Sequence, residues 1–225
     1  GEDSQMKLSK SNPPFSIDVI SEQIPDYIII TSKDLKSEFQ RLANWKTQKG
    51  VPTIVKELES IQEEYQGSDL AEKIHAYLQE CYRKWGAGLF VLLGGDVNII
   101  PARYFNVPPG QKYAGDYPSD AYYTDLNHLF TEWGKDKMKQ DRLCYIGRAS
   151  VENVKEAKIF INKVLLYEKM ENMNTKYLMN HLAASAYISK SESTGKLYND
   201  AKASINNYLS HYPQIKKWYL FDHYN

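Results

Sequence analysis

The stretch Gly88-Leu-Phe-Val-Leu-Leu-Gly-Gly-Asp-Val-Asn-Ile-Ile-Pro-Ala-Arg103 decides how the rest of this sequence is interpreted. Its apolar run, Leu89 to Leu93, is followed by two glycines and then by an acid, Asp96. An apolar run of this length between glycines is typical of a strand buried on both faces, as in a parallel sheet. The glycines permit a tight exit at the carboxyl end of the strand, where open α/β sheets place their functional groups. Asp96 is therefore a candidate site residue.

Strands and helices alternate before this stretch. Residues 1–24 are polar and predict an extended N-terminal arm. Thr31 ends a predicted strand and is expected to cap the next helix, with Asp34 as the acid of a capping box. The predicted elements from the arm to the opening strand are strand 26–31, a helix ending near residue 50, strand 52–55 and helix 69–86. This order predicts two right-handed βαβ units and a parallel sheet.

The regular pattern stops after the opening strand. Residues 101–141 are expected to be irregular, and irregular segments of this length are often functional. The expected elements that follow are a short strand 143–146 ending before Gly147-Arg148, a helix capped by Ser150, a polar break at 172–175, strand 182–188, a helix through Leu197, Ala201, Ile205 and Leu209, and strand 215–221. The sequence thus predicts an α/β fold in which a three-layer, parallel-sheet subdomain over 25–170 precedes the strand–helix–strand start of a second subdomain over 171–225.

Composition excludes several classes of function. Lysine plus arginine equals aspartate plus glutamate, 28 each, so no net charge favours nucleic acid. No apolar run approaches the ~20 residues that span a bilayer. The chain begins with Gly1 and has no signal peptide, and it stops at a strand end; we expect a trimmed, secreted or surface protein that continues further. Its two cysteines, Cys81 and Cys144, are expected to be buried thiols.

Carboxylates are frequent in and around the irregular segment. Asp96, Asp116, Asp120 and Asp125, together with Asn127, offer the oxygen ligands that Ca²⁺ prefers. Their spacing matches no EF-hand loop, and solvated loop acids are the alternative. The sequence therefore leaves a calcium site at Asp116, Asp120 and Asp125 as one of two interpretations.

Gly147 and Arg148 directly follow the predicted strand 143–146. A guanidinium there can pair in a bidentate manner with Asp96 or with Asp120, which predicts a structural polar cluster. The histidines lack the spacing of a zinc helix and of a nucleophile–base pair. A Gly-x-Ser-x-Gly elbow and a phosphate-binding loop are also absent from the sequence. No catalytic residue follows from these residues alone.

Three motifs in order carry a resemblance to a known family. They are Leu92-Leu-Gly-Gly-Asp-Val-Asn-Ile-Ile-Pro101, Ser119-Asp-Ala-Tyr-Tyr-Thr-Asp125 and Tyr145-Ile-Gly-Arg-Ala-Ser-Val-Glu-Asn153. With the entry segments Tyr27-Ile-Ile-Ile-Thr and Trp45-Lys-Thr-Gln-Lys-Gly50, they make residues 25–225 resemble the gingipain-type cysteine peptidases.

The resemblance implies that the second subdomain is caspase-like and that catalysis uses a cysteine nucleophile with a histidine in a Gly-His-Gly. No Gly-His-Gly is present here, and Cys144 falls outside the nucleophile position, so the dyad is expected beyond Asn225. In arginine-specific members an acid lines the primary specificity pocket. The matching zone makes Asp200 the candidate, with a solvated helix acid as the alternative. The resemblance also implies calcium binding.

The leading hypothesis is the N-terminal part of a secreted or surface cysteine endopeptidase that acts on protein or peptide substrates. This part would support the catalytic subdomain and the substrate pocket, and the remainder of the polypeptide would carry the catalytic residues. A non-catalytic module that binds peptides or glycans through residues 101–141 is the alternative. A flavodoxin-like nucleotide domain rests on βαβ order alone, and a fold by itself does not define a function.

Overall fold

The computed structural model describes residues 24–86, 88–107, 109, 115–126, 143–170, 175–185, 189–190, 197–198, 205 and 207–221. The chain divides into two compact units, residues 1–166 (unit 1) and 167–225 (unit 2), and the division falls within the last turns of one helix. The N-terminal arm expected over 1–24 lies almost entirely outside the described residues.

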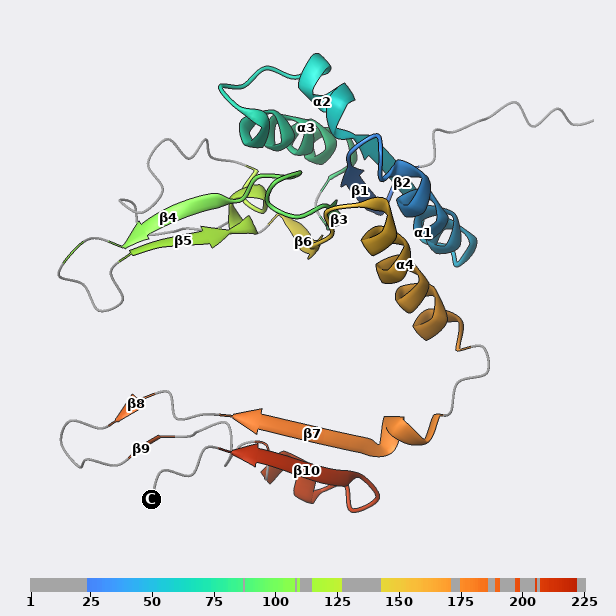
Figure 1. The fold of residues 1–225 in the computed structure, drawn as a ribbon, viewed down its shortest axis with the longest axis vertical. Coiled ribbons are helices and arrows are strands. Elements are labelled where there is room, and N and C mark those ends of the chain that lie inside the picture. Colours follow the sequence, from blue (N-terminus) through green and yellow to red (C-terminus); the bar gives the residue numbers. More distant parts are fainter. Residues whose placement is uncertain are drawn as a thin grey trace, which may run out of the picture. The chain divides into compact units, whose positions relative to one another are not determined.

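Unit 1 is built on a four-stranded parallel sheet in the order β2-β1-β3-β6. Its strands are β1 (Tyr27–Thr31), β2 (Thr53–Glu57), β3 (Leu89–Gly94) and β6 (Cys144–Ala149). Its helices are α1 (Lys36–Gln48), α2 (Leu58–Glu64), α3 (Leu70–Trp85) and α4 (Val154–Lys169). The parallel-sheet α/β fold predicted from the opening stretch is confirmed, and Figure 1 labels these elements.

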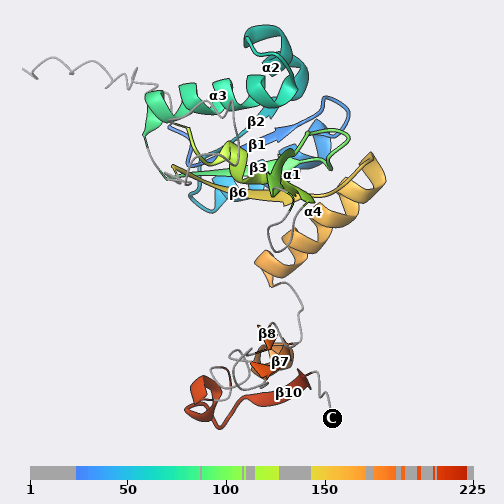
Figure 2. The ribbon, with the colours of Figure 1, turned by 90° about the vertical axis from the view of Figure 1, so that its left-hand side faces the viewer.

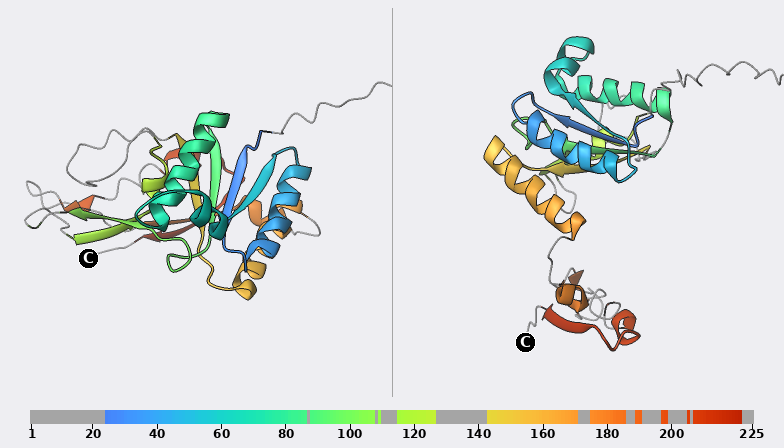
Figure 3. Two further views of the ribbon diagram at one scale, coloured as in Figure 1. Left: turned by 90° about the horizontal axis from the view of Figure 1, so that it is seen from above. Right: turned by 90° about the vertical axis from the view of Figure 1, so that its right-hand side faces the viewer.

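Helices cover both faces of this sheet, which makes three layers. Figure 2 and the right-hand view of Figure 3 show α2 and α3 on one side of the strands and α1 and α4 on the other. The core is accordingly split into two clusters. One packs Ile28, Ile30 and Leu93 against α3, and the other packs Ile29 and Leu92 against α1 and α4. Because strand side chains alternate between faces, the unbroken apolar runs of β1 and β3 supply both clusters.

The segment expected to be irregular contains regular structure. An antiparallel ribbon joins β4 (Arg103–Val107) to β5 (Gly115–Ser119), and the 3₁₀ turn η1 (Asp120–Tyr123) follows. Figure 1 shows the ribbon extending away from the parallel sheet. Strand β5, Gly-Asp-Tyr-Pro-Ser, contains Gly, Asp and Pro, which are uncommon in strands, and this composition hid it.

Two predicted helix caps are wrong. Thr31 is the buried last residue of β1, and its Oγ1 donates to the carbonyl of Gly94 at 2.6 Å, so the Thr31–Asp34 capping box does not form. The helix after β6 is capped by Asn153, whose Oδ1 accepts from the Glu156 amide at 3.1 Å, and not by Ser150. By contrast, the predicted cap of α3 is confirmed, because the Asp69 carboxylate accepts from the Glu72 amide at 3.0 Å.

Unit 2 contains a parallel pair of strands, β7 (Asn180–Ser185) and β10 (Lys216–Phe221). The other described elements are η2 (Thr175–Met179), β8 (Ser189–Lys190), β9 (Leu197–Tyr198) and the helical residues 207–210. Leu197 lies in a strand rather than in the predicted helix, and Ala201 lies outside the described residues. The strand–helix–strand order otherwise agrees with the prediction. No helix among the described residues is both long enough and apolar enough to cross a membrane.

Candidate functional site

The carboxyl ends of β3 and β6 meet around the Gly94-Gly95 turn. A Cβ atom on Gly94 would lie 2.8 Å from ring carbons of Phe39, and a Cβ on Gly95 would lie 2.8 Å from Cγ2 of Ile99. The two glycines are therefore required by close packing, because α1 and the loop after β3 leave no room for a side chain. This packing explains why the opening stretch carries two glycines at the strand exit.

Arg148 makes most of the side-chain polar contacts at the carboxyl ends of β3 and β6, and it lies within β6 rather than after it. Its Nε and Nη2 atoms donate to the two carboxylate oxygens of Asp120 at 2.9 and 2.7 Å. Its Nη1 donates to the backbone carbonyls of Gly95 and Ile100, both at 2.8 Å. Only 11% of the Arg148 side chain is exposed. One guanidinium thus ties β6, the loop after β3 and η1 together through four charge-assisted hydrogen bonds.

Asp96 does not join this cluster through Arg148. Its carboxylate accepts from the backbone N–H of Asn98 at 2.7 Å, and its own N–H donates to the carbonyl of Val151 at 3.0 Å. Asp96 therefore closes the turn after β3. Of the two carboxylates considered as partners for Arg148, Asp120 is the one in contact.

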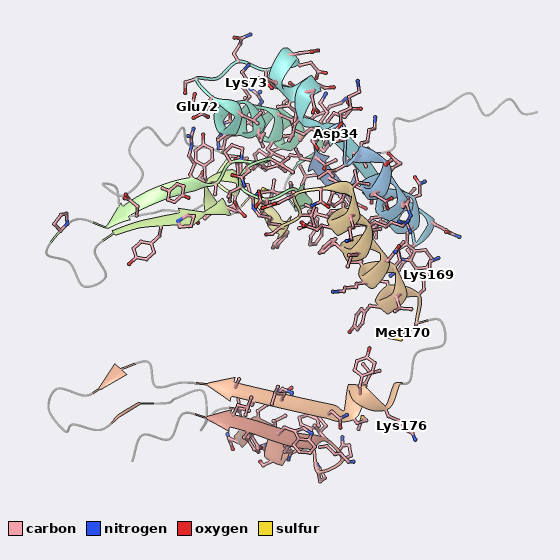
Figure 4. The ribbon with its side chains drawn as sticks, in the orientation of Figure 1. Asp34, Glu72, Lys73, Lys169, Met170 and Lys176 are labelled. Atoms are coloured by element: carbon pink, nitrogen blue, oxygen red, sulfur yellow. The ribbon has the colours of Figure 1, made fainter. Side chains whose placement is uncertain are left out.

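A second polar cluster fixes the start of the ribbon to α3. The Arg103 guanidinium donates to both carboxylate oxygens of Asp69 at 2.6 and 3.0 Å. It also lies 4.9 Å from the ring centroid of Tyr122, whose ring contacts His75 with centroids 4.9 Å apart. Burial acts to raise the pKa of Asp69, but the Arg103 hydrogen bonds hold that pKa below its ordinary value. Arg103 thus connects β4, η1 and the N-terminus of α3, where Glu72 also lies (Figure 4).

His75 is the most buried member of this second cluster. It is 1% exposed, and its Nε2 is 2.6 Å from the backbone carbonyl of Asp125, which makes Nε2 the protonated nitrogen. Among the described residues its Nδ1 has no hydrogen-bond partner. Burial lowers the pKa of His75. The imidazole is therefore neutral, and it joins α3 to Asp125, two residues after η1.

Both thiols are unsuited to act as nucleophiles. Cys81 on α3 and Cys144 on β6 are each 3% exposed. Burial raises the pKa of Cys81 to about 11 and that of Cys144 to about 12. The Cys144 Sγ donates to the carbonyl of Tyr123 at 3.2 Å. Because the thiolate is the reactive form, neither side chain has the character of a catalytic cysteine.

The acids predicted to bind calcium have different surroundings. Asp116 is exposed on β5, Asp120 is held by Arg148, and Asp125 is 1% exposed. In the part of the chain that the structure describes, no three His, Cys, Asp or Glu side chains come together as a metal site would require. Asn127 and the predicted pocket acid Asp200 lie outside the described residues. Calcium binding and the role of Asp200 stay predictions.

The exposed tyrosines of the ribbon do not form one platform. Tyr104 is opposite Pro118, whereas Tyr117 is opposite Phe105. Since paired residues share a face and neighbours alternate, Tyr104 and Tyr117 lie on opposite faces.

Sequence reasoning missed the second cluster altogether. His75, Arg103 and Tyr122 come from three separate elements, and no local period or motif relates them. The available signals were an arginine near the start of the segment expected to be irregular and two adjacent tyrosines, Tyr122 and Tyr123, within it. Neither signal names a partner.

The fold and the strand-edge clusters define a three-layer α/β domain built on a four-stranded parallel sheet. Residues 20–225 match the model of peptidase family C25, and the chain belongs to this family. Over 191 residues, 84% of the chain, it is 29% identical to Gingipain R2 of Porphyromonas gingivalis and spans 23% of that protein. Gingipain R1 of the same organism gives the same identity, and the chain spans 17% of it.

Solved structures give a concordant result. The crystal structure of the Arg specific cysteine proteinase gingipain R is 27% identical with a TM-score of 0.65, over 89% of this chain and 42% of that one. Latent PorU from Porphyromonas gingivalis has a TM-score of 0.54 over 74% of this chain and 20% of that one, and its 16% identity supports the fold alone. The chain thus spans about a quarter or less of the curated relatives and under half of the similar structure.

Proposed function

We propose that this chain is the N-terminal part of a gingipain-like cysteine endopeptidase whose nucleophile and general base are supplied by other residues of the same polypeptide. The observation that carries the proposal is the family match over residues 20–225, combined with the burial of the two thiols. Both cysteines of the chain are buried, with pKa values near 11 and 12. A peptidase of this family would need a more acidic, accessible thiol.

The role proposed for unit 1 is to support the catalytic subdomain. In the whole enzyme, a thiolate would attack the peptide carbonyl, an imidazole would protonate the leaving amine, and backbone N–H groups would stabilise the oxyanion. Such chemistry requires groups held to within a fraction of an ångström, and rigid elements provide this better than loops do. The Arg148 and Arg103 clusters, which fix the loops at the carboxyl end of the sheet, support this role.

Three finer proposals accompany this one. We propose that the enzyme acts outside the cell or at its surface, that it cleaves protein or peptide substrates, and that it binds calcium. The gingipain-type resemblance supports all three, and the oxygen-rich segment of Asp116, Asp120 and Asp125 adds support for calcium. For Asp200 we propose a place in the primary specificity pocket, because it is the acid in the zone that matches arginine-specific members.

The test uses the full open reading frame. The protein encoded there should hydrolyse fluorogenic peptides and lose this activity on thiol alkylation. A matched variant, Cys81→Ala/Cys144→Ala, should keep both the activity and its sensitivity to the alkylator. Activity that resists alkylation, or alkylation sensitivity that disappears in the folded double variant, would overturn the proposal. Peptides with arginine before the scissile bond should lose rate selectively in Asp200→Asn, and chelation should lower the thermal midpoint if calcium is bound.

A further inference from the structure

Phe90 on β3 and Tyr145 on β6 form an exposed aromatic pair. Their ring centroids are 5.1 Å apart with an interplanar angle of 22°, and the side chains are 51% and 62% exposed. They lie on the sheet face that α1 and α4 cover, because Leu92 and Ala149, further along the same strands and on the same side, belong to the core cluster of those helices. The cover thus stops short of the amino ends of β3 and β6.

The uncovered area extends along β6. Gly147, two residues after Tyr145 and on the same face, is exposed, and a Cβ atom built on it would meet no atom within 4 Å. On the other side, Tyr27 of β1 pairs in register with Phe90 and is partly buried, with the Lys46 ammonium 5.8 Å from its ring centroid. We call Phe90, Tyr145 and Gly147 the aromatic patch. Parallel sheets are normally covered on both faces, and among the residues that the structure describes none covers this patch.

We propose that residues 15–20 of the same chain cover the aromatic patch. Strand β1 begins at Tyr27, in the row of residues that contains Phe90 and Tyr145, so the N-terminal segment enters the sheet beside the patch. The patch lies one to two strand spacings from Tyr27, or about 5–10 Å. The seven Cα–Cα steps from Ile20 to Tyr27 can span up to about 23 Å. The segment can therefore reach the patch.

The composition of the segment fits an apolar surface on one side. Residues 15–20 lie outside the described residues, and their sequence is Phe-Ser-Ile-Asp-Val-Ile. Phe15, Ile17 and Val19 alternate with Ser16 and Asp18, which is the pattern of a segment that rests one face on an apolar surface and turns the other to water. Two aromatic rings provide such a surface.

The experiment compares two sets of substitutions in the full chain. Phe15→Ser/Ile17→Ser/Val19→Ser should lower the thermal midpoint of unit 1 by about 5 °C, as expected when a few apolar side chains lose a partly buried contact. The matched control Ser16→Asn/Asp18→Asn alters the alternate positions and should shift the midpoint by less than about 1 °C. Equal shifts in the two variants would overturn the proposal.

A second arm tests the contact itself. Phe90→Thr/Tyr145→Thr should lower the midpoint on its own, and its combination with the triple serine variant should lower it by clearly less than the sum, because both sets remove one contact. Additive shifts would overturn the proposal. Analytical sedimentation tests whether a second copy of the chain covers the patch instead. A dimer that Phe90→Thr/Tyr145→Thr dissociates, and that the triple serine variant leaves intact, would assign the patch to a partner and also overturn it.

Discussion

Replacing Arg148 by methionine should destabilise unit 1 by about 2–4 kcal/mol. Methionine keeps much of the aliphatic volume but removes four hydrogen bonds, two to the Asp120 carboxylate and two to the carbonyls of Gly95 and Ile100. Breaking a buried ion pair from one side costs about 3–5 kcal/mol. Because 28% of the Asp120 side chain is exposed, water can solvate part of the abandoned carboxylate, and the expected cost is lower.

A double-mutant cycle separates the ion pair from the two carbonyl contacts. Asp120→Ala alone should cost about 1–2 kcal/mol, and the double variant should cost less than the sum, which leaves a coupling energy of about 1–2 kcal/mol. Arg148→Lys should recover less than half of the loss. One ammonium cannot reproduce a planar fork that reaches a carboxylate and two carbonyls at once.

The assay is urea unfolding with fixed slopes for all variants. Lys36→Met is the matched control. Lys36 pairs with Glu57 at 2.5 Å, but the two side chains are 43% and 22% exposed, so this pair should contribute little to stability. An Arg148→Met cost no larger than that of this control, or strictly additive effects of Arg148→Met and Asp120→Ala, would refute the reasoning. Either result would mean that the loops at the strand ends are held by packing alone.

Three further predictions concern substitutions of single residues. The depressed pKa of His75 means that the unfolded state takes up the proton first, so stability should be full above about pH 6.5 and fall as pH is lowered toward the folded-state pKa. His75→Gln should flatten this dependence in urea midpoints between pH 8 and 5, and an unchanged slope would contradict the assignment. Gly94→Ala should cost about 1–3 kcal/mol by calorimetry because its Cβ meets the Phe39 ring at 2.8 Å, whereas Gly147→Ala, with open space, should cost under about 1 kcal/mol. Met170, which ends α4 (Figure 4) with a φ of 52°, should give a thermal midpoint about 2–4 °C higher when replaced by glycine, and no gain with alanine.

The sequence alone determined the architecture of unit 1. The apolar runs of β1 and β3 and the cap of α3 at Asp69 are local patterns, and each local pattern predicts one element. Alternation of these elements then predicts a parallel sheet, because right-handed βαβ connections leave few other topologies. The three motifs that resemble the gingipain-type peptidases are also contiguous, and the family match over 20–225 agrees with them.

Only the tertiary structure decided which polar groups meet. Arg148 had two candidate partners in sequence, and the choice of Asp120 depends on where η1 folds back over the sheet. The contacts among His75, Arg103 and Tyr122 join residues that are far apart along the chain, and side chains of these types have no preferred partner that a local pattern could reveal. The sequence indicated that Gly94 allows a tight exit from the strand. The structure shows that the Phe39 ring of α1 leaves no room for a side chain at this position. Backbone periodicity is encoded locally, whereas pairing and close packing depend on the whole fold.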